Sequence, residues 1–536
     1  MAIEWLSVLL LGSSPGPHQG RLLVAPALAG VVIALLTRFV FPQVRGSGVN
    51  QTKAALYIHN GYISFRTVIG KFLLAALAIG SGHSLGPEDP SLQIGAGVAS
   101  LVSRRVGLTR EKLRIFAPIG AAAGLAAAFN APISAILFVI EEVIGQWSAA
   151  VLGSIVLSAV SSVVVARWFW GAEPMFRIPA VTLRDPRELI AYAVLGVVGG
   201  VASLLFAKAL SVLRPMLRRQ PGWNQMLQPA VAGLLVGLIG YLGLPQVMGA
   251  GYQTIDAAIH AEFAWKMLLA LAIFKIITTT LSFSSGTPGG MFAPTLFIGA
   301  MLGAAVGTLE KAYVPHVTGS VGSYALVGMG VLFAAFLRAP LTSVFMVLEV
   351  SQNYTIILPV ILANTIAYLM SRSLQPIPIF EVFTHQDGLD LPSMEEQREE
   401  SDPHLEDALQ PVPTLLLEGD WPLDAVRQHV DASREADAYY LVRCSDGHWS
   451  GVTHSALLTM IREAAGDTTL VEQLGPERMP VLFPDLPLWS ALTHLGRWPV
   501  LAITSRARRG VLVGTITQQA VLSRYQKENR THDAEA

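Results

Sequence analysis

The stretch SGHSLGPEDPSLQIGA, residues 81–96, returns 204 positions later as SGTPGGMFAPTLFIGA, residues 285–300. A second pair follows, because APISAILFVIE at 131–141 matches APLTSVFMVLE at 339–349. An apolar chain that contains the same half twice is typical of membrane transport proteins, whose sites lie where the repeats meet. We therefore expect a transport site at the interface between the two copies.

The composition divides the chain into a membrane part and an acidic soluble part. Hydrophobic residues make up 52% of the chain and charged residues 14%, against about 25% charged in a soluble domain. Residues 1–380 carry 13 acidic and 24 basic side chains, whereas residues 381–536 carry 25 acidic and 13 basic ones. The only cysteine, Cys444, excludes a disulfide within the chain and a cysteine metal site. We expect no metal or redox cofactor and no nucleic-acid partner.

Apolar segments recur through the membrane part, and several are too short to span a membrane. Segments 117–140 and 188–212 are long, whereas 69–81 and 323–336 fall short of the about 20 helical residues that cross a bilayer. A broken helix survives in lipid only where its loose backbone is buried in protein or faces a water-filled cavity. The breaks therefore predict re-entrant helices around a site; a bundle of kinked helices is the alternative.

Gly86-Pro87-Glu88-Asp89-Pro90 has the chemistry of a helix start that faces an anion. Proline suits the first helical turn, so we expect the helix to begin near Glu88. A helix N-terminus presents free N–H groups and a partial charge of roughly +0.5, which favours an anion. The Glu88 carboxylate could occupy that place, and a mobile carboxylate that competes with a dissolved anion would form a gate. The alternative is that Glu88 is a static cap on its own helix.

Two further turns offer donors for an anion. The equivalent turn of the second copy, at 290–294, starts a helix without the acid, so the N–H groups of Met291 and Phe292 could bind an anion directly. Ser47, in a Gly-Ser-Gly turn, has a hydroxyl that can donate to an anion. Most Gly-Ser-Gly sequences form ordinary turns, which is the alternative for Ser47.

Glu141 and Glu142 end the apolar segment 117–140. An acid at membrane depth is costly and is by default a hypothesis for a functional site. Adjacent helical residues point about 100° apart, so the two acids cannot share one role. We expect one to anchor the helix through backbone or Arg contacts and the other to receive protons from the cytoplasm. The alternative is two acids at the membrane boundary with their carboxylates in water.

The composition changes again near residue 385. An acidic linker covers 386–410, and a domain at 411–536 contains two weakly similar units, at about 412–462 and 479–525. Each unit has an apolar strand-like run, a polar hairpin, a second strand that ends in Thr, and a helix. This pattern predicts a C-terminal α/β domain.

The motifs together resemble the four signature segments of the CLC family of chloride channels and chloride/proton exchangers. The segments are Gly46-Ser47-Gly48, Gly86-Pro87-Glu88-Asp89-Pro90, Gly124-Leu125-Ala126-Ala127-Ala128-Phe129-Asn130-Ala131-Pro132 and Gly290-Met291-Phe292-Ala293-Pro294. The similarity covers about residues 20–385. It implies an all-α polytopic membrane protein with broken, re-entrant helices and a homodimer with one anion path in each subunit. The transmembrane domain would cover 1–385, with inverted repeats at about 20–175 and 188–385.

The resemblance also implies a role for each matched residue. Ser47 is similar to the anion-binding serine that accompanies chloride preference, and Met291 and Phe292 match the backbone donors. Glu88 resembles the gating glutamate, and Glu142 resembles the internal proton acceptor that exchangers usually keep. The residues that match the two helix-terminus motifs are Gly86, Pro90, Gly290 and Pro294.

The chain departs from the family pattern at four positions. Pro87 replaces the usual Arg or Lys, and Asp89 replaces a Gly and adds negative charge beside Glu88, which would weaken anion entry. Asn50 stands where the first motif usually has Pro. Phe380 takes the place of the tyrosine that supplies the second anion hydroxyl, and phenylalanine has none. We therefore expect lower anion affinity and looser proton coupling.

The tail units resemble a pair of CBS modules, which often bind adenine nucleotides. In such modules an Asp three residues after the strand-end Thr often holds the ribose. Here Ala456 and Ala520 stand at those positions, after Thr453 and Thr517. We therefore favour a regulatory or dimer-stabilising tail over a nucleotide site.

These observations predict a chloride/proton antiporter, not an enzyme, that spans the inner membrane several times with a cytoplasmic tail. Its expected partners are chloride, protons, the lipid bilayer and a second copy. The main alternative is a passive voltage- or pH-gated chloride channel of the same fold. The Ser47 turn disfavours a fluoride exchanger, and His83 and Ser84 show no nucleophile–base motif of a membrane enzyme. A sensor with an inert membrane domain is the last alternative.

Overall fold

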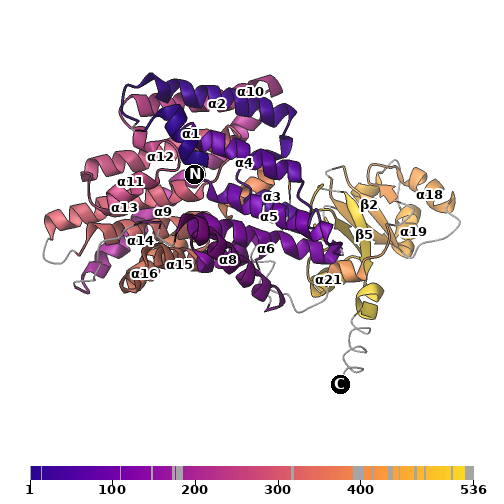
Figure 1. Ribbon diagram of the computed structural model, residues 1–536. Coiled ribbons are helices and arrows are strands. Elements are labelled where there is room, and N and C mark those ends of the chain that lie inside the picture. The colour runs from indigo at the N-terminus through magenta and orange to yellow at the C-terminus, as the bar shows by residue number, and fades with distance from the viewer. Residues whose placement is uncertain are drawn as a thin grey trace. The chain divides into compact units, whose positions relative to one another are not determined.

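The computed structural model describes residues 2–13, 15–108, 110–145, 149–171, 175–176, 185–314, 319–389, 391, 404–412, 416–432, 439–445, 447–463, 468–475, 478–508 and 511–524. The chain forms two compact units, Met1–Gln386 and Asp387–Ala536. The first unit is built from helices, and the second combines helices with short strands (Figure 1).

The first unit mixes complete and partial membrane spans. Its helices are α1 (Ala2–Leu11), α2 (Gly20–Phe39), α3 (Val49–Tyr57), α4 (Phe65–Gly80), α5 (Glu88–Arg105), α6 (Arg110–Phe129), α7 (Pro132–Phe138), α8 (Ala149–Trp170), α9 (Glu188–Arg218), α10 (Gly222–Tyr241), α11 (Tyr252–Ile259), α12 (Trp265–Ser284), α13 (Phe292–Tyr313), α14 (Val321–Leu337), α15 (Pro340–Ser351), α16 (Ile357–Leu374) and α17 (Ile379–Gln386). Among the described residues, six helical segments are long and apolar enough to cross a membrane. Shorter apolar helices, including α14 and α15, accompany them.

The order of elements repeats after α9. Helices α2 to α8 correspond in order to α10 to α16, and the short turn η1 (Pro42–Val44) corresponds to η3 (Pro245–Val247). Both turns read Pro-Gln-Val, 203 positions apart, and each leads through a glycine with positive φ into a short helix, α3 or α11. This third pair of matching sequences escaped the sequence analysis, and so did the two short helices.

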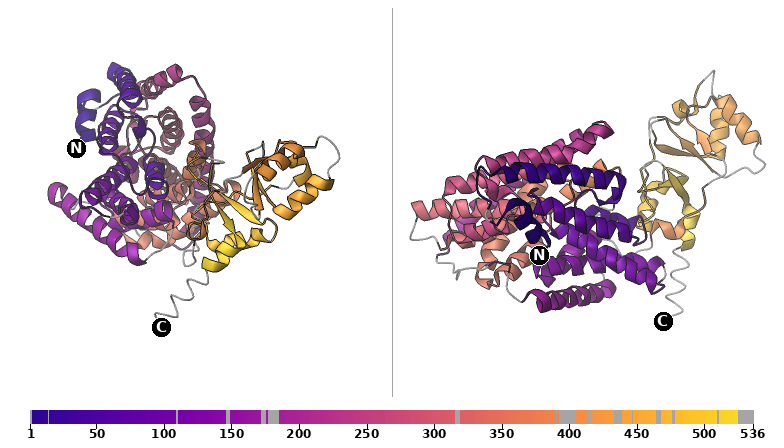
Figure 2. Two further views of the ribbon diagram at one scale, coloured as in Figure 1. Left: turned by 90° about the vertical axis from the view of Figure 1, so that its right-hand side faces the viewer. Right: turned by 45° about the horizontal axis from the view of Figure 1, so that its top comes forward.

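Equivalent helices of the two copies pack together. Helix α2 lies along α10 at one edge of the unit (Figure 1), and a rotated view shows the same pairing (Figure 2). Within the first copy α5 packs along α6, and within the second copy the equivalent helices α13 and α14 pack along each other. Every residue of α14 is buried. A helix that is apolar on all sides is stable only inside the protein or the membrane, so α13 and α14 form the interior of this unit.

The apolar segment 117–140 is not one continuous helix, and the sequence analysis did not place the break within it. The chain breaks after α6 at Asn130, whose φ is 54°, and α7 starts at Pro132. A positive φ ends a helix, and proline is well placed in the first turn of the next one. Arg338, with φ 61°, and Pro340 form the equivalent break between α14 and α15. The breaks place two more helix N-termini inside the unit.

The second unit contains two small sheets. Strand β2 (Tyr439–Arg443) pairs in parallel with β1 (Leu416–Glu418) and antiparallel with β3 (Trp449–Thr453). Strands β4 (Val500–Thr504) and β5 (Leu512–Thr517) form an antiparallel pair, and Leu482 bridges β4 in parallel. The helices are α18 (Leu423–Ala432), α19 (His454–Glu463), α20 (Leu470–Leu474) and α21 (Leu488–Leu495).

Both parts of the second unit follow the same order of elements. A first extended segment, a helix, two antiparallel strands and a final helix occur in each, the last being residues 518–524. Thr453 Oγ1 accepts a hydrogen bond from the Ala456 N–H at 3.2 Å, and Thr517 Oγ1 accepts one from the Ala520 N–H at 3.3 Å. Each strand-end threonine therefore caps the helix that follows it.

Candidate functional site

The two copies of the repeat meet at Gly86 and Gly290. The Gly86 N–H donates to the Gly290 carbonyl at 2.8 Å, and the Gly290 N–H donates to the Gly86 carbonyl at 2.7 Å, as an antiparallel bridge. Equivalent residues that pair with each other in antiparallel direction are what an inverted repeat predicts at its axis. Helices α5 and α13 begin two residues later, at Glu88 and Phe292, so two helix N-termini start at this junction. Pro90 and Pro294 lie in their first turns.

The Gly-Ser-Gly turn at 46–48 lies against the same junction. The Gly289 N–H donates to the Gly46 carbonyl at 3.5 Å. Ser47 is buried, and its Oγ accepts a hydrogen bond from the Val49 N–H at 3.3 Å. This contact uses the hydroxyl oxygen as acceptor and leaves the hydroxyl proton to donate elsewhere. The structure therefore brings together the three turns that the sequence indicated.

Glu88 is fully buried, and its Oε1 accepts a hydrogen bond from the hydroxyl of Tyr252. Tyr252 is the first residue of α11 and directly follows the turn that repeats the Ser47 turn. The second carboxylate oxygen, Oε2, has no hydrogen-bond partner within the described part of the chain. Tyr252 lies 164 residues from Glu88 and belongs to none of the motifs, so the sequence analysis missed it.

Asp89 contacts the start of the equivalent helix in the other copy. Its Oδ2 accepts a hydrogen bond from the Met291 N–H at 3.1 Å, and its side chain is fully buried. A Cβ at Gly290 would lie 2.6 Å from Asp89 Cγ, so only glycine leaves room for this carboxylate. The expected anion donor at Met291 is thus occupied by Asp89 in this structure.

Two buried lysines support the turns around the junction. Lys71 of α4 donates to the carbonyls of turn 44–46 at 3.1 and 2.6 Å, and Lys275 of α12 donates to those of turn 247–249 at 3.0 and 2.8 Å. The sequence analysis missed both lysines. They are 204 positions apart, the offset of the matched stretches, so the repeat itself was the signal that could have identified them.

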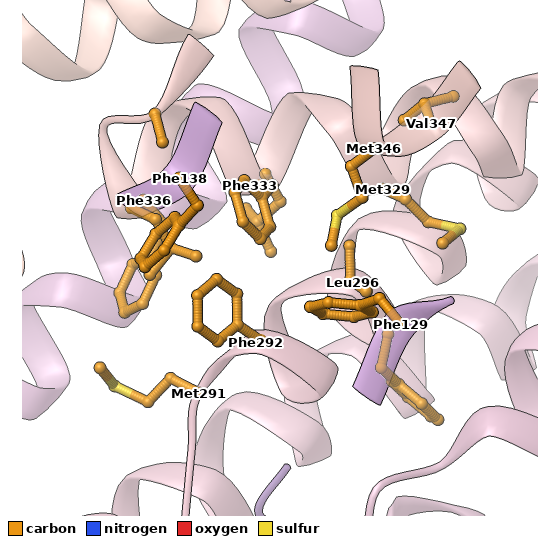
Figure 3. Close-up of a cluster of buried hydrophobic side chains, with 14 of the residues drawn as sticks. Phe129, Phe138, Met291, Phe292, Leu296, Met329, Phe333, Phe336, Met346 and Val347 are labelled. Atoms are coloured by element: carbon orange, nitrogen blue, oxygen red, sulfur yellow. The ribbon is translucent and has the colours of Figure 1, made fainter. Parts of the chain in front are cut away.

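The side chain of Phe292 packs into an aromatic cluster. Its ring centroid lies 4.7 Å from that of Phe138, 5.2 Å from that of Phe333 and 5.9 Å from that of Phe129. Figure 3 shows the Phe292 ring turned toward Phe138 and Phe333. The cluster fixes the first turn of α13, whose leading N–H groups have no partner inside the helix. The ring anchors the helix start, while the backbone remains the source of donors.

Helix α3 connects the Ser47 turn with Phe380 and Glu142. Asn50 Nδ2 donates to the Phe380 carbonyl at 3.1 Å, and Lys53 Nζ donates to Glu142 Oε1 at 2.7 Å in a buried ion pair. Asn50 and Lys53 are three residues apart and therefore lie on one face of the helix. The structure thus brings Phe380 and Glu142 to the helix that begins at the Ser47 turn; Lys53 was not expected.

Glu141 has the anchoring role that was expected for one of the two acids. Its carboxylate accepts hydrogen bonds from two N–H groups and the Thr342 hydroxyl at the start of α15, at 2.6 to 3.1 Å. The equivalent Glu349 accepts from two N–H groups at the start of α7, at 2.9 and 2.7 Å. Glu141 and Glu349 thus each cap a broken helix of the other copy. Glu142, the neighbour of Glu141, instead contacts Lys53.

The fold and these buried charges define a membrane ion-transport protein, and comparison with known proteins names its family. The family profile described as voltage gated chloride channel matches residues 29–372. An H(+)/Cl(-) exchange transporter, ClcA of Citrobacter koseri, is 33% identical over 390 residues, which are 71% of this chain and 82% of that protein. A ClcB-like chloride channel protein of Ralstonia nicotianae is 32% identical over 361 residues, which are 67% and 83%. The chain belongs to the voltage-gated chloride channel, or CLC, family.

Solved structures share the fold. A slow cyanobacterial Cl−/H+ antiporter aligns with a TM-score of 0.64 at 25% identity, over 72% of this chain and 91% of that chain. A eukaryotic CLC transporter also aligns with a TM-score of 0.64, at 20% identity, and this match covers 97% of this chain and 93% of that one. The prediction of a CLC-type helical membrane protein is confirmed.

Proposed function

We propose that this protein exchanges chloride for protons across a membrane. The observation that carries the proposal is the junction of α5, α13 and the Ser47 turn, with the Glu88 carboxylate buried beside it. Helix N-termini and a hydroxyl are donors for an anion, and a carboxylate binds and releases protons. The relatives named as H(+)/Cl(-) exchange transporters support this function.

In the proposed cycle Glu88 is the gate and Glu142 is the internal proton acceptor. When Glu88 is protonated it withdraws, and chloride binds to the Ser47 hydroxyl and the N–H groups at the start of α13, those of Met291 and Phe292. When Glu88 loses the proton, its carboxylate returns and displaces chloride. Protons reach Glu88 from the cytoplasmic side through Glu142, which Lys53 holds beside α3 at 2.7 Å.

The position of Phe380 supports a chloride site with one hydroxyl donor. Phe380 is buried and offers its carbonyl, an acceptor, to Asn50. An acceptor repels an anion, and the phenyl ring has no donor. We propose that chloride is held by Ser47 without a second hydroxyl, and that protons are coupled to chloride less tightly for that reason.

The protein is further proposed to act as a homodimer in the inner membrane, with the second unit in the cytoplasm. Six long apolar helices among the described residues support a multi-pass protein. The shared order of elements in the second unit supports a CBS-like pair. Ala456 and Ala520 donate to the capping threonines and bring no carboxylate for a ribose. We therefore propose a regulatory or dimer-stabilising tail without a bound nucleotide.

An enzyme would need a nucleophile beside a base. The candidates for these roles, Ser84 and His83, make other contacts. His83 Nε2 lies 3.2 Å from the Pro26 carbonyl, and Ser84 Oγ lies 2.9 Å from Thr279 Oγ1. These contacts connect helices of the membrane unit and do not pair a serine with a histidine.

The test is chloride-driven proton movement by the purified chain in liposomes. Liposomes are loaded with chloride, diluted into low chloride, and followed with a chloride electrode and a pH electrode. The proposal expects protons to move uphill while chloride leaves, with both fluxes absent from protein-free liposomes. Chloride efflux without proton movement would make the protein a passive channel, and Glu142 a structural acid.

Tyr252→Phe is expected to speed exchange by about tenfold or more without changing the ratio of protons to chloride. The hydroxyl holds the Glu88 carboxylate in this structure, and a hydrogen bond to a charged group contributes about 1.5–3 kcal/mol. Without it, Glu88 leaves this position more readily in each cycle. The measurement is the initial rate of both fluxes, with Tyr313→Phe, an exposed tyrosine, as the matched control. An unchanged rate would show that Glu88 does not depend on this contact.

A further inference from the structure

Two neighbouring carboxylates on α5 contact the second copy, and Glu88 interacts with the Ala293 backbone in the first turn of α13 as well as with α11. Glu88 accepts from the Tyr252 hydroxyl at the start of α11, and Asp89 accepts from the Met291 N–H at the start of α13. Both side chains are fully buried. The family resemblance assigns gating to Glu88 alone and has glycine at position 89. The structure therefore contains one more buried acid at the junction than the proposed cycle uses.

The Asp89 carboxylate lies where an anion would bind. The Met291 N–H is one of the donors that α13 presents to an anion, and Asp89 Oδ2 takes it at 3.1 Å. Asp89 Oδ1 has no hydrogen-bond partner among the residues that the structure describes, and Gly290 gives the carboxylate its space. One oxygen thus remains buried without a donor.

The buried charges around the junction are divided between the two acids. Lys71 of α4 interacts electrostatically with Asp89, and Lys275 of α12 interacts with Glu88. Both lysines are fully buried and belong to equivalent helices of the two copies. Each carboxylate therefore has its own hydrogen-bond donor and its own cation, and the two neighbouring carboxylates also interact electrostatically with each other.

We propose that Asp89 is a second gating residue, whose carboxylate occupies the anion position at the start of α13 and must leave before chloride binds there. The inference rests on the proposed function, which assigns the Met291 N–H to chloride. Chloride entry then requires two acids to move, Glu88 away from the site and Asp89 away from Met291. The alternative is that Asp89 only ties the two copies together as a structural contact.

The test compares chloride binding by wild type, Asp89→Asn and Asp89→Gly. The asparagine variant keeps the size of the side chain and removes its charge, and the glycine variant has the residue usual in the family. Chloride is titrated into the purified full chain by calorimetry, and crystals of each protein are soaked in bromide to locate the anion by anomalous scattering. Ser91→Ala, two residues further along α5, is the matched control, because the Ser91 hydroxyl donates to the Pro87 carbonyl at the start of the same helix, at 2.8 Å.

Both Asp89 variants are expected to bind chloride at least about tenfold more tightly than wild type. In wild type, chloride must displace the charged Asp89 carboxylate from its hydrogen bond with the Met291 N–H, and the variants lack that charge. Bromide should appear beside the Met291 N–H in the variants and not in wild type, while proton-coupled exchange persists. Equal affinities overturn the proposal, as does bromide beside Met291 in wild type with Asp89 in place. Lower thermal stability without tighter binding makes Asp89 a structural contact. Wild-type liposomes without exchange would overturn the proposed function itself.

Discussion

Glu88→Gln is expected to abolish chloride-driven proton movement while chloride still crosses the membrane. Glutamine has nearly the shape of protonated glutamate but neither binds nor releases a proton under these conditions. The side chain can still accept from the Tyr252 hydroxyl, so the fold around α5 should be kept. Without a carboxylate, nothing competes with chloride from position 88 and nothing passes the proton on.

The measurement uses the same loaded liposomes and both electrodes. Proton movement should fall to the level of protein-free liposomes, and chloride efflux should continue. Glu262→Gln is the matched control, since Glu262 is an exposed acid three residues after the end of α11 and should leave both fluxes unchanged. Proton movement that survives in Glu88→Gln would mean that another acid carries the proton, with Asp89 as the first candidate.

The architecture could be predicted because the duplication is visible as matching stretches of sequence at a constant offset. The two 16-residue copies indicated the junction of α5 and α13, and glycines at equivalent positions form its antiparallel bridge. Apolar content and short segments indicated a membrane protein with broken helices. The break at Asn130 was missed, because alanine and glycine continue the apolar pattern up to it and a single residue with positive φ leaves no periodic signal.

The partners of the site residues could not be predicted in the same way. Tyr252 is 164 residues from Glu88, and Met291 is 202 residues from Asp89. Such contacts depend on which side chains fill the junction once the copies have packed, and no local pattern encodes them. Lys71 and Lys275 are an exception, because they follow the repeat offset and could have been found by aligning the copies further.

The ion pair of Lys53 and Glu142 allows stability and proton transfer to be separated. Lys53 Nζ lies 2.7 Å from Glu142 Oε1, with side chains 10% and 2% exposed. Breaking a buried pair by removing one partner costs about 3–5 kcal/mol, because a buried charge loses its compensation, whereas replacing both partners is often nearly neutral. The contribution of the Lys53–Glu142 ion pair to stability can therefore be measured with a double-mutant cycle.

Lys53→Met and Glu142→Gln are each expected to lower the Tm of the purified protein in detergent, and the double variant should recover most of the loss. Proton movement should follow a different pattern. It should be lost in Glu142→Gln and stay lost in the double variant, because neither keeps the acid that receives cytoplasmic protons, while chloride still moves in both. If the double variant regains stability and also regains proton movement, Glu142 serves only as the partner of Lys53, and protons reach Glu88 by another path.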